Sequence, residues 1–514
     1  MGQLLTSYKT GTMYGVANAI ASNGVAYYAF GAWPVPTANV ADTAADDSTA
    51  LGSSNWQMMF GKRIQTSDVA AAAPNYAWTS NTVYTRYDST QPMTGLQFYT
   101  VGPPTQLGAF WNLYVCIDNA NGAPSTSAPT LVQQTTFQTA DGYRWRYVGA
   151  VSDQQYVKFA TEDWVPIFAN AVVQLSAMTY SGVEVVPVTQ GGSGYATYDS
   201  GMIGYVANSQ CFQIVSNTGS STYNGFYVDS DIYVYNATQL NPAQLLTVTG
   251  YVANASGNWI FVSPAMNTSY VTAYQTLYSI APAVAIASDG VIQPQAYSVV
   301  NSQANSIQSV VVIEPGSEVS WANVAIVANS YYGSGASAYA IVPPPGGFGS
   351  NPAAELGASA LVITFQFSNT ELGTIPVGVS YSRVGLLQNP YQLNPDGTKS
   401  SVPLAANTFN QLLEAGSTPS TAVFPVGTIV QGQTSGAYGM VALSNSQAVW
   451  LTGDKTFSAG EVVASLDGMI EATVDVTYLG ALYARDLRPI YVQNINTVTR
   501  TATTSEAYRL VISI

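Results

Sequence analysis

Short strand-like runs separated by turn residues dominate this chain and constrain its fold more than any other feature. Valine, threonine and tyrosine recur through segments such as Tyr227–Tyr235, and Ser309–Ile313 is a shorter run of β-branched residues. Gly, Asn, Pro and Ser interrupt these runs about every ten residues, as in all-β proteins. The pattern predicts a mainly β, multi-domain, β-sandwich-like protein with a few short helices.

Helical spacing of apolar residues is confined to three segments. Ser54–Ile64 has the clearest pattern, Tyr14–Ala21 is shorter, and Phe409–Glu414 is the weakest of the three. Residues that recur every three to four positions line one face of a helix. We therefore expect helices in these segments and strands through most of the remaining chain.

The length of 514 residues suggests two to four domains. Composition divides the chain into an aromatic-rich β region at 1–175, a central β region at 176–345, and a C-terminal β region at 346–514. The last region is a candidate for packing with the first into one body. Its final alternation, Glu506–Ile514, predicts a strand held in a sheet.

The central region contains a degenerate repeat. Val185–Tyr195 is echoed by Val311–Trp321, and each copy reads as a strand, a glycine turn and an aromatic residue that packs back. Glycine suits the turn because it adopts positive φ without strain. The stretch between the copies, about 200–290, is predicted to be an insertion of extra strands.

Charge is scarce and negative. Charged residues make up 8% of the chain, against about 25% in typical proteins, and the net charge is −14. The 14 Lys and Arg residues form no basic run, so phosphate-based nucleic-acid binding and attraction to an anionic membrane are both disfavoured. No apolar run is long enough for a transmembrane helix, and we expect no membrane insertion. An uncharged polar surface costs little to desolvate, which suits burial against neighbours, although an ordinary secreted β protein would share it.

Catalytic chemistry has few candidates. The chain has no histidine, which removes Ser-His-Asp and Cys-His catalysis and most zinc sites. Cys116 and Cys211 lie in apolar strand contexts and are expected to be free buried thiols, as in a reducing cytoplasm. Glycoside hydrolysis needs only two carboxylates, but nothing selects a pair among the acids. The densest acidic cluster, Asp42, Asp46 and Asp47, lacks the calcium-loop pattern and is read as a solvated loop.

An ordered series of aromatic and glycine motifs runs through most of the chain. They are Tyr27–Trp33, Gly61–Ile64, Trp78–Tyr84, Leu113–Asn119, Asn121–Pro129, Asp141–Tyr147, Gly192–Tyr195, Pro345–Pro352, Glu355–Ala358, Arg383–Pro390, Gly432–Ala437, Phe457–Glu461 and Tyr491–Asn494. In this order they resemble the dimeric, β-rich baseplate wedge subunit of contractile-tailed, T-even-like bacteriophages. The matching motifs cover residues 27–195 and 311–514, and the stretch at about 200–290 has no counterpart in that family.

The resemblance implies a virion protein assembled in the host cytoplasm. It implies a homodimer within each of six wedges, which bridges other wedge proteins and relays the rearrangement that triggers sheath contraction. It implies no catalytic site and no cofactor. Two other functions stay open at this stage: a tail fibre or spike that binds host-surface glycans, and a carboxylate-based polysaccharide hydrolase.

Two departures from the family pattern concern contacts with partners more than the fold. The family usually has a histidine where Phe348 stands, and it has more basic residues around Arg383.

Two segments and the single residue Arg383 are candidate partner interfaces. The segment Asp141–Tyr147 places aromatics at alternate positions, which puts them on one face of a strand, and the loop 343–355 has glycines that allow close backbone approach. The candidate interface residues are Tyr143, Trp145, Tyr147, Gly346, Gly347, Phe348, Asn351 and Arg383. The competing interpretation makes the loop a structural turn and the aromatic segment part of the core.

Overall fold

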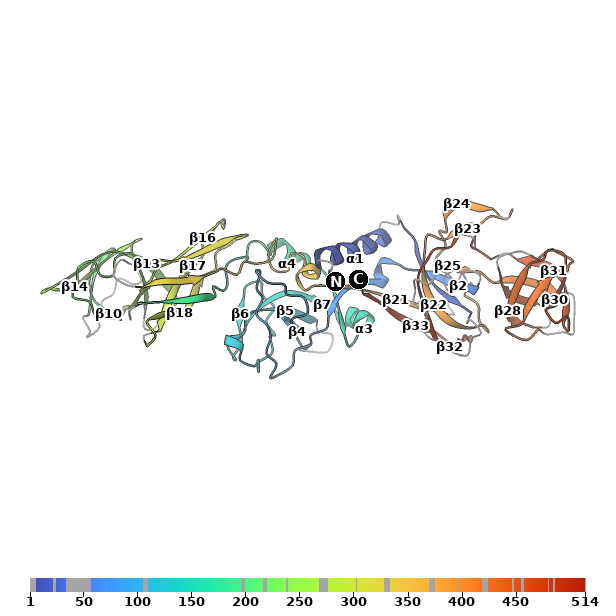
Figure 1. Ribbon diagram of the computed structural model, residues 1–514, viewed down its shortest axis with the longest axis horizontal. Coiled ribbons are helices and arrows are strands. Elements are labelled where there is room, and N and C mark those ends of the chain that lie inside the picture. Colours follow the sequence, from blue (N-terminus) through green and yellow to red (C-terminus); the bar gives the residue numbers. More distant parts are fainter. Residues whose placement is uncertain are drawn as a thin grey trace. The chain divides into compact units, whose positions relative to one another are not determined.

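The computed structural model describes most of the chain. The described residues are 6–21, 25–33, 57–104, 110–195, 199–215, 220–236, 239–267, 276–301, 303–327, 333–368, 375–396, 398–417, 424–445, 448–453, 457–478, 480–483 and 486–513. The acidic residues Asp42, Asp46 and Asp47 lie outside them. Strands dominate, which confirms the predicted mainly β, multi-domain class (Figure 1). Contacts divide the chain into unit 1, residues 1–72 with 359–514, and unit 2, residues 73–358.

Unit 1 contains one helix, two sheets, a hairpin and a closed barrel among its described residues. The five-stranded sheet has the order β25 (Thr408–Asn410), β2 (Met58–Arg63), β1 (Tyr27–Ala32), β22 (Ser380–Gln388), β32 (Pro489–Thr499). The second sheet joins β33 (Glu506–Ser513), β21 (Ala360–Phe367) and β3 (Val69–Pro74). The other elements are α1 (Thr6–Ala21), η1 (Thr66–Asp68), β23 (Tyr391–Leu393) and β24 (Lys399–Pro403). The barrel strands are β26 (Leu413–Ser417), β27 (Ile429–Gly432), β28 (Tyr438–Ser444), β29 (Ala448–Thr452), β30 (Val462–Ser465) and β31 (Glu471–Tyr478).

The five-stranded sheet of unit 1 is buried on both faces. Along β1, Tyr27 and Ala29 belong to one buried cluster, whereas Tyr28 and Phe30 belong to another. The first cluster also contains residues of β21 and β33, so the two sheets pack face to face as a sandwich. The ring of Phe60 on β2 meets that of Phe367 on β21, edge to face, at 5.0 Å between centroids.

In unit 1, strands from the N-terminal and C-terminal regions of the chain pair within the same sheets. Strand β1 pairs with β22, and β3 pairs with β21. The C-terminal strand β33 pairs with β21 along its whole length, as the final alternation predicts. These long-range pairings place the unit boundaries at 72 and 358, not at the sequence-based boundaries of 175 and 345.

One of the three helix predictions is confirmed. The helix α1 includes Tyr14–Ala21 and begins eight residues earlier than expected, at Thr6. The prediction for Ser54–Ile64 is wrong from Met58 on, because Met58–Arg63 forms strand β2, which lies between β25 and β1. The prediction for Phe409–Glu414 is also wrong, because that segment contributes to β25 and β26. A strand buried on both faces carries consecutive apolar residues, which also satisfy a helical spacing test.

Unit 2 contains an aromatic sheet, paired strands and a second closed barrel. The sheet has the order β4 (Tyr99–Val101), β5 (Trp111–Asp118), β7 (Arg144–Val151), β6 (Phe137–Gln138). The paired strands are β9 (Val188–Ser193) with β20 (Ser334–Ala338), β16 (Val284–Ser288) with β19 (Ala322–Ile326), and β17 (Gln295–Asn301) with β18 (Ser306–Glu314). The barrel strands are β10 (Ser200–Asn208), β11 (Cys211–Ile214), β12 (Ser230–Asn236), β13 (Gln239–Asn254), β14 (Gly257–Ser263) and β15 (Thr276–Pro282). The remaining elements are η2 (Ala120–Gly122), α3 (Asp153–Phe159), β8 (Trp164–Ile167), α4 (Ala171–Ser176) and α5 (Pro352–Glu355).

The degenerate repeat holds in the φ of its glycines and differs at its aromatic residues. Gly192 and Gly316 both have positive φ, at 65° and 78°, but Gly192 lies inside strand β9, and only Gly316 follows the end of a strand, β18. Tyr195 is buried, but Trp321 is 53% exposed. The aromatic residue therefore packs back in the first copy only.

The predicted insertion at about 200–290 is largely the barrel β10–β15. Its strands pair in the ring β10-β11-β14-β13-β12-β15, and those of the unit 1 barrel pair in the ring β26-β29-β28-β27-β30-β31. The two rings match when β14 and β15, the last two strands of the first barrel, are equated with β26 and β27, the first two of the second. The barrels thus share one antiparallel pairing scheme with circularly permuted chain order. Because each ring is closed, neither has a free strand edge that could pair with other chains.

A buried carboxylate makes the stability of the β10–β15 barrel depend on pH. The Oδ2 atom of Asp231, on β12, accepts a hydrogen bond from the Val284 amide at 3.0 Å. Burial raises the pKa of Asp231 from 3.8 to about 6, against the opposing effect of this hydrogen bond. Because the folded pKa is the higher one, the folded barrel binds the proton more tightly. Its stability is therefore highest below the unfolded pKa and falls as pH rises to the folded pKa.

We expect Asp231→Asn to stabilise the barrel at neutral pH. Asparagine keeps an acceptor for the Val284 amide and avoids the buried charge, so the free energy of opening of β12 should rise by about 2–3 kcal/mol. Hydrogen–deuterium exchange of β12, corrected for intrinsic rates at each pH, measures this change. The control is Asp229→Asn, which removes the same charge from an exposed side chain. Equal effects of the two variants would refute the prediction.

Candidate interface segments and the arginine–glutamate clamp

The predicted aromatic face exists, but it points into unit 2. Tyr143, Trp145 and Tyr147 join one buried cluster and are 0%, 0% and 5% exposed. The Trp145 ring stacks on that of Tyr143 at 5.5 Å and meets that of Tyr84 edge to face at 5.3 Å. Side chains enclosed in this way are core residues and present no surface to a partner. The core interpretation therefore replaces the interface interpretation for these three residues.

Asp141, at the start of the same segment, holds a neighbouring motif in place. Its Oδ2 atom accepts hydrogen bonds from Ser125 Oγ at 2.9 Å and from the amides of Thr126 and Ser127 at 2.7 and 2.9 Å. Burial alone would raise the pKa of Asp141, but hydrogen bonds from Thr139, Ser127, Thr126 and Ser125 outweigh it and lower the pKa to about 2. The ionised carboxylate thus joins two of the sequence motifs, Asn121–Pro129 and Asp141–Tyr147.

The glycine–proline loop approaches its own chain closely. Gly347 and Gly349 both have positive φ, at 89° and 87°. A Cβ atom on Gly347 would lie 2.3 Å from the Ala177 carbonyl oxygen, and one on Gly349 would lie 2.3 Å from Val173 Cγ1. Glycine is required here because the loop packs against α4 and the residue that follows it.

The other loop candidates have structural contacts as well. Phe348 is 5% exposed and meets the Tyr87 ring edge to face at 5.1 Å. Asn351 is exposed, and its Oδ1 atom caps α5 by accepting from the Ala354 amide at 3.3 Å. Gly346 is exposed and adopts a φ of 83°. Of the loop candidates, Gly346 and Asn351 therefore lie on the surface of unit 2, whereas Gly347 and Phe348 are buried in it.

Glu355 organises the loop from within. Its carboxylate accepts hydrogen bonds from the amides of Gly349 and Asn351, at 2.6 and 2.8 Å, and from Ser350 Oγ at 3.3 Å. Burial raises the pKa of Glu355, and these hydrogen bonds oppose the rise. The Arg146 guanidinium, on β7, lies 5.9 Å from the centre of the Phe348 ring. The structure therefore brings the aromatic segment and the loop, two sequence-predicted sites, into contact.

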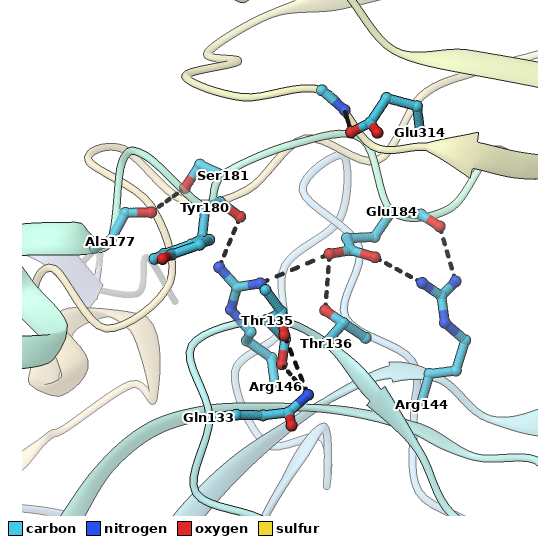
Figure 2. Close-up of polar contacts among 11 residues, drawn as sticks. Gln133, Thr135, Thr136, Arg144, Arg146, Ala177, Tyr180, Ser181, Glu184 and Glu314 are labelled. Atoms are coloured by element: carbon cyan, nitrogen blue, oxygen red, sulfur yellow. Dashed lines mark hydrogen bonds and ion pairs between the residues drawn. The ribbon is translucent and has the colours of Figure 1, made fainter. Parts of the chain in front are cut away.

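Ion pairs between two arginines and a glutamate tie β7 to residues 180–184, which precede β9 in the chain (Figure 2). Glu184 lies between Arg144 and Arg146, with 2.6 Å from its Oε2 to Arg144 Nη2 and 3.7 Å from its Oε1 to Arg146 Nη1. Thr136 Oγ1 donates to Glu184 Oε1 at 2.8 Å, and Arg146 Nη2 donates to the Tyr180 carbonyl at 2.7 Å.

One arginine of the clamp is buried, and the other is partly exposed to solvent. The side chains of Arg146, Glu184 and Arg144 are 3%, 9% and 30% exposed. Burial lowers the pKa of Arg146, while the charges of Glu184 and Glu355 act in the opposite direction. Arginine nevertheless keeps its proton in proteins, so Glu184 compensates a buried positive charge. We call these three residues the Glu184 clamp.

Arg383 belongs to unit 1, whereas the other candidates belong to unit 2. It is 5% exposed, and its Nε and Nη1 atoms donate to Asn494 Oδ1 and Gln57 Oε1, both at 3.0 Å. Burial lowers the pKa of Arg383. Its role in the free chain is to cross-link β22, β32 and the start of β2, in place of the predicted partner contact.

Glu461, in the unit 1 barrel, binds backbone amides of a loop in the same way as Asp141 and Glu355 do in unit 2. Glu461 accepts hydrogen bonds from the amides of Thr434 and Ser435 at 2.9 and 2.7 Å, and from the Ser458 amide at 2.5 Å. Burial opposes ionisation, but the hydrogen bonds prevail and lower the pKa of Glu461. This carboxylate joins the motifs Gly432–Ala437 and Phe457–Glu461.

Sequence reasoning missed the Glu184 clamp. One signal was present, because Arg144 and Arg146 alternate with the aromatics of β7 in a chain with only 14 Lys and Arg residues. Two cations two residues apart on a buried strand need a compensating acid. No sequence feature identifies Glu184, which is 40 residues from Arg144.

No family model matches the chain, and no curated protein matches it. Within the described residues there is no group of three or more Cys, Asp or Glu side chains that could hold a metal ion. No helix in the described part of the chain is long and apolar enough to cross a membrane.

Proposed function

We propose that the chain is a structural subunit of a bacteriophage tail baseplate wedge. In this role it bridges neighbouring wedge proteins and relays the rearrangement that triggers sheath contraction. The ordered motifs and their resemblance to the wedge subunit family motivate the proposal. It assigns no catalytic activity and no cofactor.

One observation carries the proposal: the motif residues serve as internal braces. Asp141, Glu355 and Glu461 each bind backbone amides of a glycine- or serine-rich loop, and the Glu184 clamp ties β7 to the following segment. Hydrogen bonds to ionised groups are stronger than neutral ones, and each is directional. A set of loops fixed in this way suits a protein that transmits force between partners.

The surface chemistry supports the same role. With 8% charged residues, most of the surface is uncharged and polar, and such a surface loses little hydration free energy when it meets a neighbour. The partners under this proposal are other wedge proteins and a second copy of the chain, in a sixfold baseplate within the virion. Nucleic acid and membrane are not among the partners.

Labelling of purified virions tests the location. Antibody fragments raised against this chain, conjugated to gold and imaged by electron microscopy, should mark the baseplate at the end of the tail distal to the head. A label confined to fibres or spikes would favour the alternative, a host-surface glycan-binding protein. A particle that carries the antigen nowhere would exclude both functions and revive the hydrolase.

A further inference from the structure

The outer face of the β10–β15 barrel carries aromatic side chains on β10 and β14, the two strands that flank β11. Tyr205 on β10 is opposite Gln213 on β11, and Gln213 is opposite Trp259 on β14. The alternate residues Phe212 and Ile260 point inward and are 0% exposed. Tyr205, Gln213, Trp259 and Phe261 therefore share the outer face, since residues two apart on a strand lie on the same side. We call these four residues the aromatic face.

The rings of the aromatic face form a corner. The centroids of Tyr205 and Trp259 lie 5.9 Å apart, and their planes meet at 81°. The two residues come from strands separated by β11, so the rings lean toward each other across Gln213. Tyr205 is 53% exposed and Phe261 is 40% exposed. A ligand at this corner could therefore contact the rings of Tyr205 and Trp259 at the same time.

Two close contacts hold this arrangement in place. Gln213 Nε2 donates to the Ser256 carbonyl at 2.7 Å, which fixes its amide beside the rings. A Cβ atom on Gly257 would lie 1.7 Å from Gln213 Nε2, so only glycine leaves room for the amide. At Gly250 a Cβ atom would lie 3.1 Å from Phe261 Cδ2, which shows how closely that ring covers β13.

The chemistry around the aromatic face is neutral. Between residues 200 and 288 the only charged side chains are those of Asp229 and Asp231, with no Lys, Arg or Glu. Anionic ligands such as phosphate, sulfated glycans or nucleic acid need cations to hold them, and none lies in this stretch. Asn, Gln, Ser, Thr and Tyr supply hydroxyl and amide groups that bond a neutral polar ligand.

We propose that the aromatic face binds a neutral saccharide. One side of a sugar ring presents C–H groups of slight positive charge, which suit the negative face of an aromatic ring. Its rim presents hydroxyl groups, which suit the Gln213 amide and its polar neighbours. At the corner of Tyr205 and Trp259, aromatic rings for the C–H groups lie directly beside the Gln213 amide for the hydroxyl groups.

This inference goes beyond the proposed structural role and does not depend on it. The barrel lies in the stretch that has no counterpart in the wedge subunit resemblance, so saccharide binding would be an added property of this chain. A protein neighbour is the competing occupant, because Met202 and Val215, 36% and 43% exposed, extend the face with apolar surface. The fixed amide between the rings and the absence of charge favour the saccharide.

Saturation-transfer NMR with the full-length chain tests the inference. The probes are three neutral oligosaccharides: maltohexaose, cellohexaose and chitohexaose. We expect transfer to at least one of them, and we expect Trp259→Ala and Tyr205→Ala each to weaken binding by about tenfold or more, as loss of an aromatic anchor does. Trp321→Ala is the matched control, because it removes an exposed tryptophan outside the barrel.

Three results would overturn the inference. They are no transfer to any probe, binding that Trp259→Ala leaves unchanged, and self-association of the wild-type chain in sedimentation that Trp259→Ala abolishes. Unchanged hydrogen exchange of β12 in the variants would show that the barrel still folds. The two binding results do not bear on the baseplate role, which is tested in virions, whereas self-association through the aromatic face would overturn the saccharide inference and still agree with a homodimer in the wedge.

Discussion

Trp145→Ala is expected to lower the free energy of unfolding of unit 2 by about 3–5 kcal/mol, the usual cost of removing a large aromatic side chain from a core. Trp145 is 0% exposed and packs against the rings of Tyr84 and Tyr143. Because a domain is stable by only about 5–15 kcal/mol, a loss of this size removes a large share of the stability of the unit. Urea denaturation and hydrogen exchange of β5 and β7 measure the effect.

Two further variants separate a core role from an interface role. Trp145→Phe keeps a ring in the core and removes an indole N–H that has no hydrogen-bond partner among the described residues, so its cost in stability should be smaller than that of Trp145→Ala. Trp321→Ala changes an exposed side chain and should alter stability by no more than about 0.5 kcal/mol. A Trp145→Ala chain that unfolds like the wild type but fails to join its partners would contradict the core assignment.

Glu184→Ala is expected to lower the free energy of unfolding of unit 2 by about 3–5 kcal/mol, because it leaves the buried charge of Arg146 without its ion-pair partner. The Arg146 side chain is 3% exposed, and Glu184 is its acidic partner in the clamp. Arg144 loses less, since its side chain is 30% exposed and can be solvated. Hydrogen exchange should therefore accelerate in β7 and in residues 180–184 together.

Glu314→Ala is the matched control for the clamp. Glu314 is exposed and accepts a hydrogen bond from the Gly316 amide at 3.2 Å, so its removal deletes the same charge without exposing a buried cation. Glu184→Gln keeps the shape of the side chain and should lie between wild type and Glu184→Ala. If Glu184→Ala and Glu314→Ala have the same effect on stability, the clamp does not brace unit 2.

Local patterns predicted much of the secondary structure. The spacing of β-branched and aromatic residues predicted strands, the end of the chain predicted β33, and Tyr14–Ala21 predicted part of α1. The break in the repeat predicted the insertion that forms the β10–β15 barrel. These features depend on side-chain alternation and turn residues, which are local properties of the chain.

Features that depend on distant partners could not be predicted. The segment Met58–Arg63 has helix-like spacing, but it pairs with β1 and β25 and is packed between two buried clusters, which makes it a strand. The unit boundaries follow from pairing of β1 with β22, more than 300 residues apart in the chain. Tertiary contacts of this kind override local preference.

The candidate interface residues show the same limit. The alternation of Tyr143, Trp145 and Tyr147 predicted a common face but not whether that face is turned to the core or to a partner. The glycines of the loop predicted close backbone approach, and the approach is to Ala177 and Val173 of the same chain. Burial distinguishes these alternatives, and it is set by the whole unit.

The copy number of the chain in purified virions tests the structural role most directly. Quantitative mass spectrometry, with the major sheath protein as internal standard, gives this number for each particle. A baseplate wedge subunit predicts a fixed, low number in multiples of six, and a dimer in each wedge predicts two copies for each of the six. A number in multiples of three but not of six would point to a fibre or spike, and absence from the particle would contradict the structural role altogether.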